Sequence, residues 1–195
     1  FSSRYAATPA SAPSYNVTLN DGNVTPGGTL IVNASSLTGQ LQTFALDAHT
    51  VTGNLHILGG SSTDTIVSGS GNDIIWGGLG QDTLTGGAGA DVFEYHSLDD
   101  STTAAADHIL DFTSGTDKID LSAIDANPST AGNDAFVFSN DGTFHGINGE
   151  VREFFDAAHG WWVIDGDVNG DGQADFTIHV TTQGNVPLVS TDFIL

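Results

Sequence analysis

The chain has 195 residues, enough for one domain with a substantial core, and it carries 24 acidic residues against three basic ones. A net charge of -21 at pH 7 excludes the electrostatics of nucleic-acid or anionic-membrane binding, and no apolar run reaches the ~18 residues of a membrane span. Because the chain contains no cysteine, packing and bound metal must supply its stability.

The N-terminal part divides into a linker and a series of short strands. Residues 1–14 are rich in Ser, Ala and Pro and lack a hydrophobic period, so we interpret them as a linker. Over residues 15–58, apolar runs separated by Asn, Gly and Pro predict β-strands. Ile57 lies nine residues before Ile66, in register with the repeat that follows. We therefore expect a stacked ladder to begin near Thr50, with the earlier strands forming a β cap, because an uncovered stack exposes an edge.

Residues 59–94 form four contiguous nonapeptides, GGSSTDTIV, SGSGNDIIW, GGLGQDTLT and GGAGADVFE. Glycine occupies 10 of the 12 residues at the first, second and fourth places, the exceptions being Ser62 and Ser68. A flexible Gly/Ser/Asp linker would have no reason to keep a large apolar residue at every eighth place. The sixth place is occupied by Asp64, Asp73, Asp82 and Asp91, and the eighth by Ile66, Ile75, Leu84 and Phe93.

The spacing predicts a coil of two units. The glycine-rich half of each unit can bend tightly, and the other half is a minimal strand with one side chain pointing inward. Two units then make one coil, and equivalent residues recur every eighteen residues, alternating between two sheets. The predicted stacked pairs are Ile66 with Leu84, Ile75 with Phe93, Asp64 with Asp82, and Asp73 with Asp91.

Stacked aspartates repel one another unless a cation lies between them. Calcium suits this arrangement because it takes about 6–8 oxygen ligands and mixes carboxylates with the backbone carbonyls that a glycine-rich turn exposes. Asp100 lies eighteen residues after Asp82, in the acidic place of the next coil, and Asp107 follows seven residues later. Together they could complete a further calcium site against residues 77–82. The alternative is a solvated acidic loop.

The remainder of the chain is strand-like, and its apolar runs are joined by Gly/Asn/Asp turns that favour antiparallel hairpins. Residues 167–175 carry the spacing of an EF-hand-like calcium loop, but Ile178 occupies the place of the bidentate Glu, so a hairpin turn is the other interpretation. Trp161 and Trp162 face opposite ways in a strand, one filling the core and the other covering the roll or stacking on a sugar. HExxH, G-x-S-x-G, a P-loop and a cysteine nucleophile are all missing, which predicts a chain that is not an enzyme.

The ordered succession of motifs resembles a known family. The nonapeptides, DDSTTAAADHILDFTSGTDKIDLSAID, GEVREFF, GDVNGDGQADFTIHV and a terminal DFIL are similar to the C-terminal RTX module of serralysin-type secreted metalloproteases. The same module is found in other proteins exported by type I (ABC) systems, and its repeat in alginate epimerase R-modules. The resemblance covers residues 50–195.

The resemblance implies a parallel β-roll with Ca²⁺ between its turns and an uncleaved secretion signal near the C-terminus. Ser62 replaces a glycine of the pattern, which would weaken or distort the first site. The implied calcium ligands and ligand turns contain Gly60, Asp64, Gly69, Gly71, Asp73, Gly77, Gly78, Gly80, Asp82, Gly86, Gly87, Gly89 and Asp91, with Asp100 and Asp107 as an additional acidic pair.

We therefore expect an all-β chain with a linker at 1–14, a β cap at 15–58, a short parallel roll at 59–94, and a C-terminal cap and secretion-signal region at 95–195 with an antiparallel β extension. The expected function is a non-catalytic, calcium-binding folding and secretion module of a larger exported protein. Its expected partners are the type I secretion machinery and N-terminal domains of the same protein, and its expected location is extracellular or at the cell surface. The alternatives are a polysaccharide-binding module of an extracellular enzyme and an assembly module of an adhesin or S-layer protein.

Overall fold

The computed structural model describes residues 14–24, 27–39 and 41–195. The expected linker at 1–14 lies outside the described residues except for Ser14. In the described ranges the regular elements are β-strands and single-turn 3₁₀ helices, and no helix there is long and apolar enough to cross a membrane. The chain is therefore all-β, as the sequence predicts.

The elements follow one another along the chain at short intervals. The strands are β1 (Tyr15–Thr18), β2 (Thr29–Asn33), β3 (Phe44–Asp47), β4 (Asn54–Leu58), β5 (Thr65–Val67), β6 (Ile74–Trp76), β7 (Thr83–Thr85), β8 (Val92–Glu94), β9 (Asp107–Phe112), β10 (Lys118–Asp120), β11 (Val137–Ser139), β12 (Glu150–Asp156), β13 (Trp161–Asp167), β14 (Phe176–Thr182) and β15 (Phe193–Ile194). The 3₁₀ helices are η1 (Asp21–Asn23), η2 (Leu98–Asp100), η3 (Gln183–Asn185) and η4 (Ser190–Asp192).

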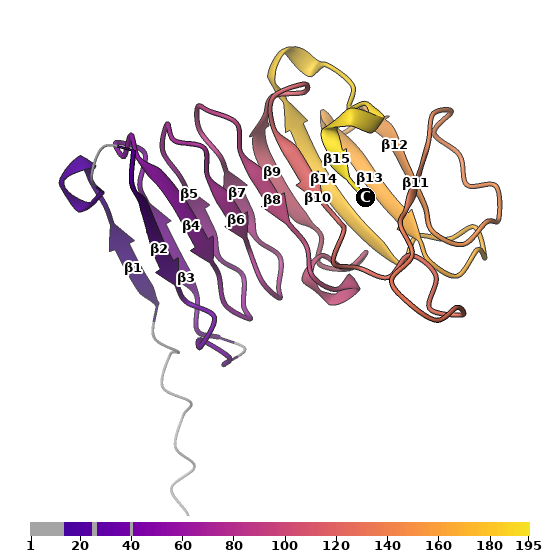
Figure 1. Cartoon of the computed structure of the whole chain (residues 1–195), viewed down its shortest axis with the longest axis horizontal. Coiled ribbons are helices and arrows are strands. Elements are labelled where there is room, and N and C mark those ends of the chain that lie inside the picture. The colour runs from indigo at the N-terminus through magenta and orange to yellow at the C-terminus, as the bar shows by residue number, and fades with distance from the viewer. Residues whose placement is uncertain (1–13, 25–26, 40) are drawn as a thin grey trace, which may run out of the picture.

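Two sheets face each other along the roll, and one of them continues past the other at the C-terminal end (Figure 1). One has nine strands in the order β1-β3-β5-β7-β9-β14-β13-β12-β11, and the other has six in the order β15-β10-β8-β6-β4-β2. From β1 to β10 the chain passes from one sheet to the other at every turn, and strands one coil apart pair in parallel. The pairing of Ile66 with Leu84 and of Ile75 with Phe93 confirms the predicted eighteen-residue coil.

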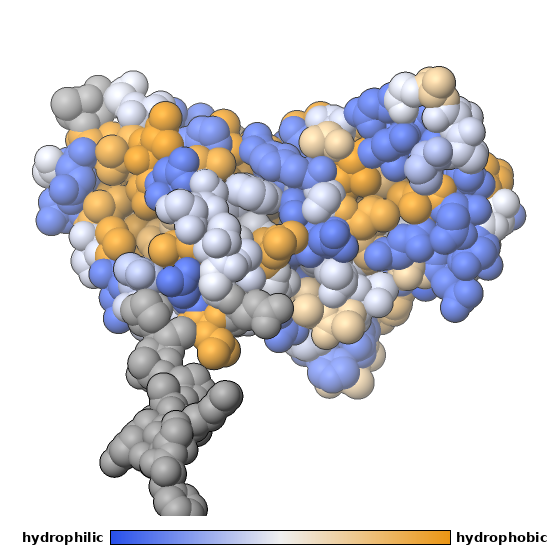
Figure 2. Space-filling view, turned by 90° about the horizontal axis from the view of Figure 1, so that it is seen from below, coloured by the Kyte–Doolittle hydropathy of each residue, from blue (hydrophilic) through white to orange (hydrophobic). Residues whose placement is uncertain are grey.

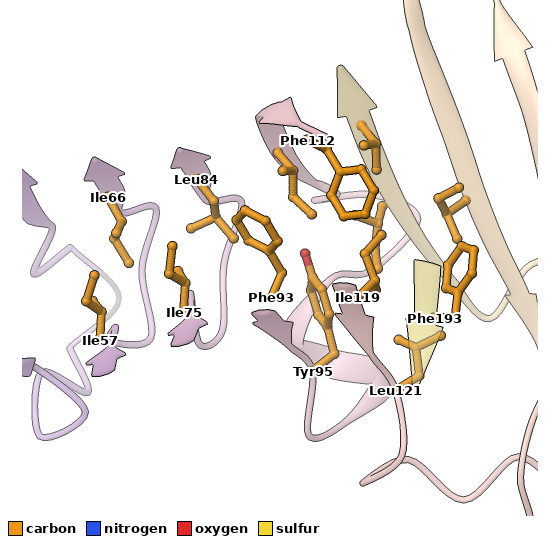
Figure 3. Packing of buried hydrophobic residues seen from close by; sticks show 14 of the residues in the cluster. Ile57, Ile66, Ile75, Leu84, Phe93, Tyr95, Phe112, Ile119, Leu121 and Phe193 are labelled. Atoms are coloured by element: carbon orange, nitrogen blue, oxygen red, sulfur yellow. The ribbon is translucent and has the colours of Figure 1, made fainter. Parts of the chain in front are cut away.

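The core of the roll is a single file of side chains, one from each short strand. Figure 3 shows that the side chains of the two sheets alternate along the axis of the roll, with Ile57 and Ile75 from one sheet and Ile66 and Leu84 from the other. All four are at most 1% exposed. Burial of one such side chain contributes about 1.5–3 kcal/mol, so each coil has little apolar burial for the backbone that it orders.

The parallel ladder begins earlier than Thr50, and this corrects the sequence-based expectation. Strand β2 pairs in parallel with β4, β3 with β5, and β1 with β3. The reason is that Val32 and Leu46 fall in register with Ile57 and Ile66, although their turns lack the Gly/Asp motif. Residues 15–58 thus extend the same two sheets, and Figure 2 shows apolar residues on the surface at this N-terminal end (left).

The C-terminal part is attached to the last coils of both sheets. Strands β12, β13 and β14 are antiparallel, as expected, and β14 joins the roll by pairing in parallel with β9. Strand β11 pairs in parallel with β12, and β15 pairs in parallel with β10 at the edge of the other sheet. The antiparallel extension is therefore limited to three strands that continue the nine-stranded sheet.

Candidate metal centre

Buried aspartates stack in two rows, one at each edge of the roll, where the turns lie. In the first ladder Asp82 Oδ1 accepts the Asp64 amide (2.7 Å), and Asp107 Oδ1 accepts the Asp82 amide (2.8 Å). Each carboxylate thus holds the backbone of the preceding coil. The first ladder consists of Phe44, Asp64, Asp82 and Asp107, and the second of Leu55, Asp73, Asp91 and Asp117.

The second ladder repeats this pattern at the other edge. Asp91 Oδ1 accepts the Asp73 amide (2.9 Å), and Asp117 Oδ1 accepts the Asp91 amide (3.1 Å). Both ladders begin with an apolar residue, because Phe44 and Leu55 donate their amides to the first aspartate (2.7 Å in each case) but carry no carboxylate. The acidic part of the roll therefore starts at Asp64 and Asp73.

The aspartates differ in the environment of their second oxygen, Oδ2. Asp64 Oδ2 accepts the Gly60 amide of its own turn (2.7 Å), and Asp73 Oδ2 accepts the Ser68 hydroxyl. The Oδ2 atoms of Asp82, Asp91 and Asp107 are buried and have no hydrogen-bond partner. A buried carboxylate oxygen without a partner is costly unless a proton or a cation neutralises it.

This difference follows the conformation of the second glycine in each turn. Gly78 and Gly87 have φ of +94° and +93°, in the region that favours glycine, whereas Gly60 and Gly69 are not among the positive-φ glycines. In the turns that contain Gly60 and Gly69, the amide of this glycine donates to the aspartate of the same turn. The turns 77–82 and 86–91 lack this bond and leave their carboxylates open.

Backbone carbonyl oxygens line the contact between stacked turns. A Cβ on Gly78 would lie 2.0 Å from the Gly60 carbonyl oxygen, and one on Gly89 would lie 2.0 Å from that of Gly71. The open Oδ2 of Asp82 is also close to the backbone of its own turn, 2.4 Å from a Cβ built on Gly77. Side chains are therefore excluded from the space between stacked turns, and carbonyl and carboxylate oxygen atoms line this thin layer. The glycines of the repeat that meet a carbonyl or carboxylate oxygen in this way are Gly59, Gly69, Gly71, Gly77, Gly78, Gly80, Gly86, Gly87 and Gly89.

Burial makes these carboxylates reluctant to ionise. Desolvation, reinforced by the charges of Asp64 and Asp100, raises the pKa of Asp82 to about 8. Desolvation, reinforced by the neighbouring acids of its ladder, raises the pKa of Asp91 to about 7. Burial likewise raises the pKa of Asp107, with the charge of Asp82 as the next cause. A cation in the layer would reverse this effect by stabilising the ionised form.

The donor set fits calcium. In the part of the chain that the structure describes, no three His, Asp or Glu side chains form a common metal-binding group. A cation in the turns would take carboxylates from stacked aspartates and complete its shell with backbone carbonyls. Hard oxygen ligands of this kind suit Ca²⁺, whereas Zn²⁺ prefers nitrogen and sulfur.

Asp100 does not occupy the place that the eighteen-residue register gives it. That place is taken by Asp107, because η2 and the residues after it interrupt the register between β8 and β9. Asp100 is nevertheless 2% exposed, so it is not in a solvated loop. Its carboxylate accepts the Trp76 indole N–H (2.8 Å) and the Ser97 hydroxyl (2.8 Å), which holds it beside the first ladder.

The sequence analysis missed two acids, Asp111 and Asp117, that contact turn 86–91 of the second ladder. Asp117 is the next rung after Asp91, and Asp111 accepts the amides of Gly86 (2.9 Å) and Gly87 (2.8 Å). The glycine half of the repeat is lost here. An aspartate two residues before a buried isoleucine is kept in Asp117-Lys118-Ile119, and the same signal marks Asp107.

The loop at 167–175 is a hairpin turn between β13 and β14. Asp167 accepts the amides of Gly170 (2.7 Å) and Gly172 (2.8 Å), and Asp175 accepts that of Val168 (2.9 Å). These carboxylates organise their own loop, which favours the hairpin interpretation over the EF-hand-like one.

The two adjacent tryptophans face opposite sides of β13. Trp162 packs against the core and contacts Phe155, with 5.2 Å between ring centroids. Trp161 stacks with His159 and with His179, each at 4.7 Å. The outer tryptophan is thus engaged by imidazoles of its own chain.

Stacked Gly/Asp turns between two parallel sheets define the chain as a β-roll module. The family described as Peptidase M10 serralysin C terminal matches residues 37–195, and the chain belongs to this family. The family is the non-catalytic C-terminal part of serralysins, which are secreted, so the chain is an extracellular module rather than a catalytic domain.

Two known proteins are similar to the chain. It is 39% identical over 103 residues to the metalloprotease AprA of Pseudomonas entomophila (strain L48), a match that covers 53% of this chain and 20% of the relative. The chain thus spans about a fifth of that relative's length. The solution structure of the AlgE6R3 subunit from the Azotobacter vinelandii mannuronan C5-epimerase is similar with a TM-score of 0.48 and 25% identity, over 84% of this chain and 83% of that chain.

Proposed function

We propose that the turns of both ladders bind Ca²⁺ and that the chain folds as a secretion module when it meets extracellular calcium. The observation that carries this proposal is the set of three buried, partnerless carboxylate oxygens on Asp82, Asp91 and Asp107. Bound calcium would supply positive charge and complete the coordination of these oxygens. Asp64 and Asp73 would contribute from the preceding turns, with the carbonyls of the glycines between them.

The chain's own charges oppose folding in the absence of a cation. Its net charge is -21, and its ladders place aspartates in successive layers. Ordering a residue costs about 1–2 kcal/mol of conformational entropy, which a single file of core side chains offsets poorly. A ligand that binds only the folded state stabilises it by RT ln(1 + [L]/Kd). The aspartates therefore make folding depend on calcium concentration.

This dependence gives the module a role in export. Extracellular calcium modules bind at ~10⁻⁴–10⁻³ M, far above the calcium level of a cell interior. We infer that the chain stays unfolded inside the cell, where a type I exporter threads it, and that residues 192–195 carry its secretion signal. Outside, the folding roll would prevent backward movement. The N-terminal domains of the same protein would be the cargo.

The test is circular dichroism of the chain in millimolar Ca²⁺, in millimolar Mg²⁺ and in EDTA. We expect the β signal to develop in calcium and to be lost in EDTA, with Mg²⁺ as the control because it keeps its waters and fits these carbonyl-rich turns poorly. A full β signal in EDTA at neutral pH would contradict the proposal. A secretion assay of a chain lacking residues 192–195 tests the signal separately, and we expect export to fail.

The polysaccharide-binding alternative lacks a suitable face in the described residues. Arg152 forms an ion pair with Asp165 (2.8 Å) and lies over the Phe144 ring at 4.2 Å. Lys118 Nζ donates to the Thr191 carbonyl (2.5 Å). With these cations and Trp161 engaged within the chain, little is left to attract an anionic polymer.

A further inference from the structure

Asp192 connects the C-terminal strand to the body of the roll. It is fully buried, and its Oδ1 accepts the Gly115 amide (2.8 Å). Its Oδ2 accepts the Ser114 hydroxyl (2.7 Å) and the Val189 amide (3.0 Å). One carboxylate thus holds the turn at 113–117 and the segment before β15 together, and charge-assisted hydrogen bonds of this kind are among the stronger ones.

The turn that Asp192 holds lies directly on a candidate calcium turn. Asp117 ends this turn, accepts the Thr113 amide (2.7 Å) with one oxygen and accepts the Asp91 amide (3.1 Å) with the other. The Lys118 amide in turn donates to the Asp91 carbonyl (2.8 Å). A continuous path of hydrogen bonds therefore runs from turn 86–91 through turn 113–117 to Asp192.

Strand β15, which follows Asp192 directly, packs against the same end of the roll. Phe193 pairs with Ile119 and is 7% exposed, and its ring lies 5.1 Å from that of Phe138. The Leu121 amide donates to the Ile194 carbonyl (2.9 Å). Figure 3 shows Phe193 beside Leu121 and Ile119, at the end of the row of buried side chains.

The electrostatics link this docking to a cation. Docking of β15 buries Asp192 at the edge that already holds Asp91, Asp111 and Asp117, while Lys118 donates to a carbonyl rather than to any of them. Burying another negative charge there is unfavourable unless positive charge is close. A cation at turn 86–91 would offset the repulsion, and by linkage the docked strand would raise the affinity of that turn for the cation.

We propose that Asp192 acts as a latch, so that calcium at turn 86–91 controls whether residues 189–195 are docked or exposed. This inference rests on the proposed calcium binding. With this latch, the C-terminal segment is available to a protein that recognises it only while the second ladder is free of calcium. Once calcium binds to that ladder, the segment is docked and hidden.

The first experiment compares Asp91→Ala, in the second ladder, with the matched variant Asp82→Ala, in the first. Amide hydrogen exchange is measured at Leu121 and Val189 in saturating calcium. We expect exchange to be faster in Asp91→Ala by ~5-fold or more, the lower range of typical coupling between sites. Equal exchange in the two variants would overturn the latch, since a general loss of stability affects both.

The second experiment tests the reciprocal effect and does not require either of those variants to fold. Asp192→Ala should raise the calcium concentration at the folding midpoint by ~5-fold or more. The control is Asp171→Ala, which removes one exposed carboxylate from the β13–β14 loop and should leave the midpoint unchanged. Equal midpoints for the two variants would refute the latch while calcium-dependent folding stands. A wild-type chain that binds no calcium would instead refute the proposed function itself.

Discussion

The aspartates of one ladder are chemically unequal, because their second oxygens have different partners. Asp64 uses both oxygens on backbone amides, whereas Asp82 donates its amide to Asp107, accepts that of Asp64 and keeps one oxygen open. Asp82 therefore lies between two aspartates of its ladder, Asp64 and Asp107, and can contribute to a site on either side. Asp64 has an aspartate on one side only, because the next residue of the ladder on its other side is Phe44.

Replacing these two aspartates by alanine should give unequal results. We expect Asp82→Ala to weaken calcium binding in both adjoining layers and Asp64→Ala to weaken it in one. Asp82→Ala also leaves the buried Asp64 amide without its acceptor, at a cost of about 1–3 kcal/mol. Calorimetric titration counts the calcium ions lost, and equal losses in the two variants would argue against the stacked register.

The raised pKa values of the open carboxylates predict an unusual pH dependence in EDTA. The pKa of Asp82 is raised from 3.8 to about 8 and that of Asp91 to about 7. A carboxyl whose pKa is higher in the folded state favours folding below its unfolded pKa, and this contribution is lost as pH rises through the folded value. Without calcium the fold should therefore be more stable at about pH 5 than at about pH 8.

Circular dichroism in EDTA across this range measures the effect: we expect part of the β signal to return at about pH 5. Asp82→Asn, which cannot titrate, should flatten this pH dependence. With calcium present the sign reverses, because protons compete with the cation for the same oxygens. Stability in EDTA that rises from about pH 5 to about pH 8 would show that the buried carboxylates do not control folding.

At the scale of the element, the spacing between stacked turns depends on the absence of side chains. Gly78 has φ of +94°, and a Cβ there would lie 2.0 Å from the Gly60 carbonyl oxygen. Gly172 has φ of +81° in an open hairpin loop, with nothing within 4 Å of a Cβ. An alanine at either position would therefore have an unfavourable left-handed backbone, but only the alanine at residue 78 would also clash with a neighbouring turn.

Gly78→Ala should consequently destabilise the roll more than Gly172→Ala. Both variants carry the cost of a left-handed alanine, about 1–2 kcal/mol. Only Gly78→Ala must also move turn 77–82 away from turn 59–64, which adds about 1–3 kcal/mol and separates the oxygens that would share a cation. Urea unfolding in calcium compares the two, and equal destabilisation would mean that the turns are not held at contact distance.

The coils that sequence could predict are those in which the turn length is constant. Between residues 59 and 94 each aspartate stacks eighteen residues from its partner, so the period alone placed Asp64 with Asp82. The step from Asp64 back to Phe44 is 20 residues, and the step from Asp82 to Asp107 is 25. A register count fails at both places, because the sheet requires only that the strands align and the turns can absorb additional residues.

At the scale of the molecule, the charge and the thin core act in the same direction. A chain of this length has a radius of gyration of roughly 16 Å when compact and roughly 47 Å when unfolded. We expect small-angle scattering to show the expanded form in EDTA at low salt and contraction when calcium is added. High sodium chloride is the control, because it screens the net charge of -21 without entering the turns. If sodium chloride alone gave the compact form, screening rather than site binding would explain the switch.

The two edges of the roll also restrict how such a chain can change in length. Strand β7 leads to β9 and β14 in one sheet, whereas β8 leads to β10 and β15 in the other. Adding one nonapeptide would exchange the two sheets for every later strand, so β9 and the strands that continue its sheet through β14 would lie on the opposite side of the roll relative to β1 and β3. Adding two restores the match, because eighteen residues make one full coil. Gain or loss of repeats in even numbers therefore keeps the two ends of the roll in the same relative orientation, and related rolls that keep this orientation should differ by whole pairs of nonapeptides.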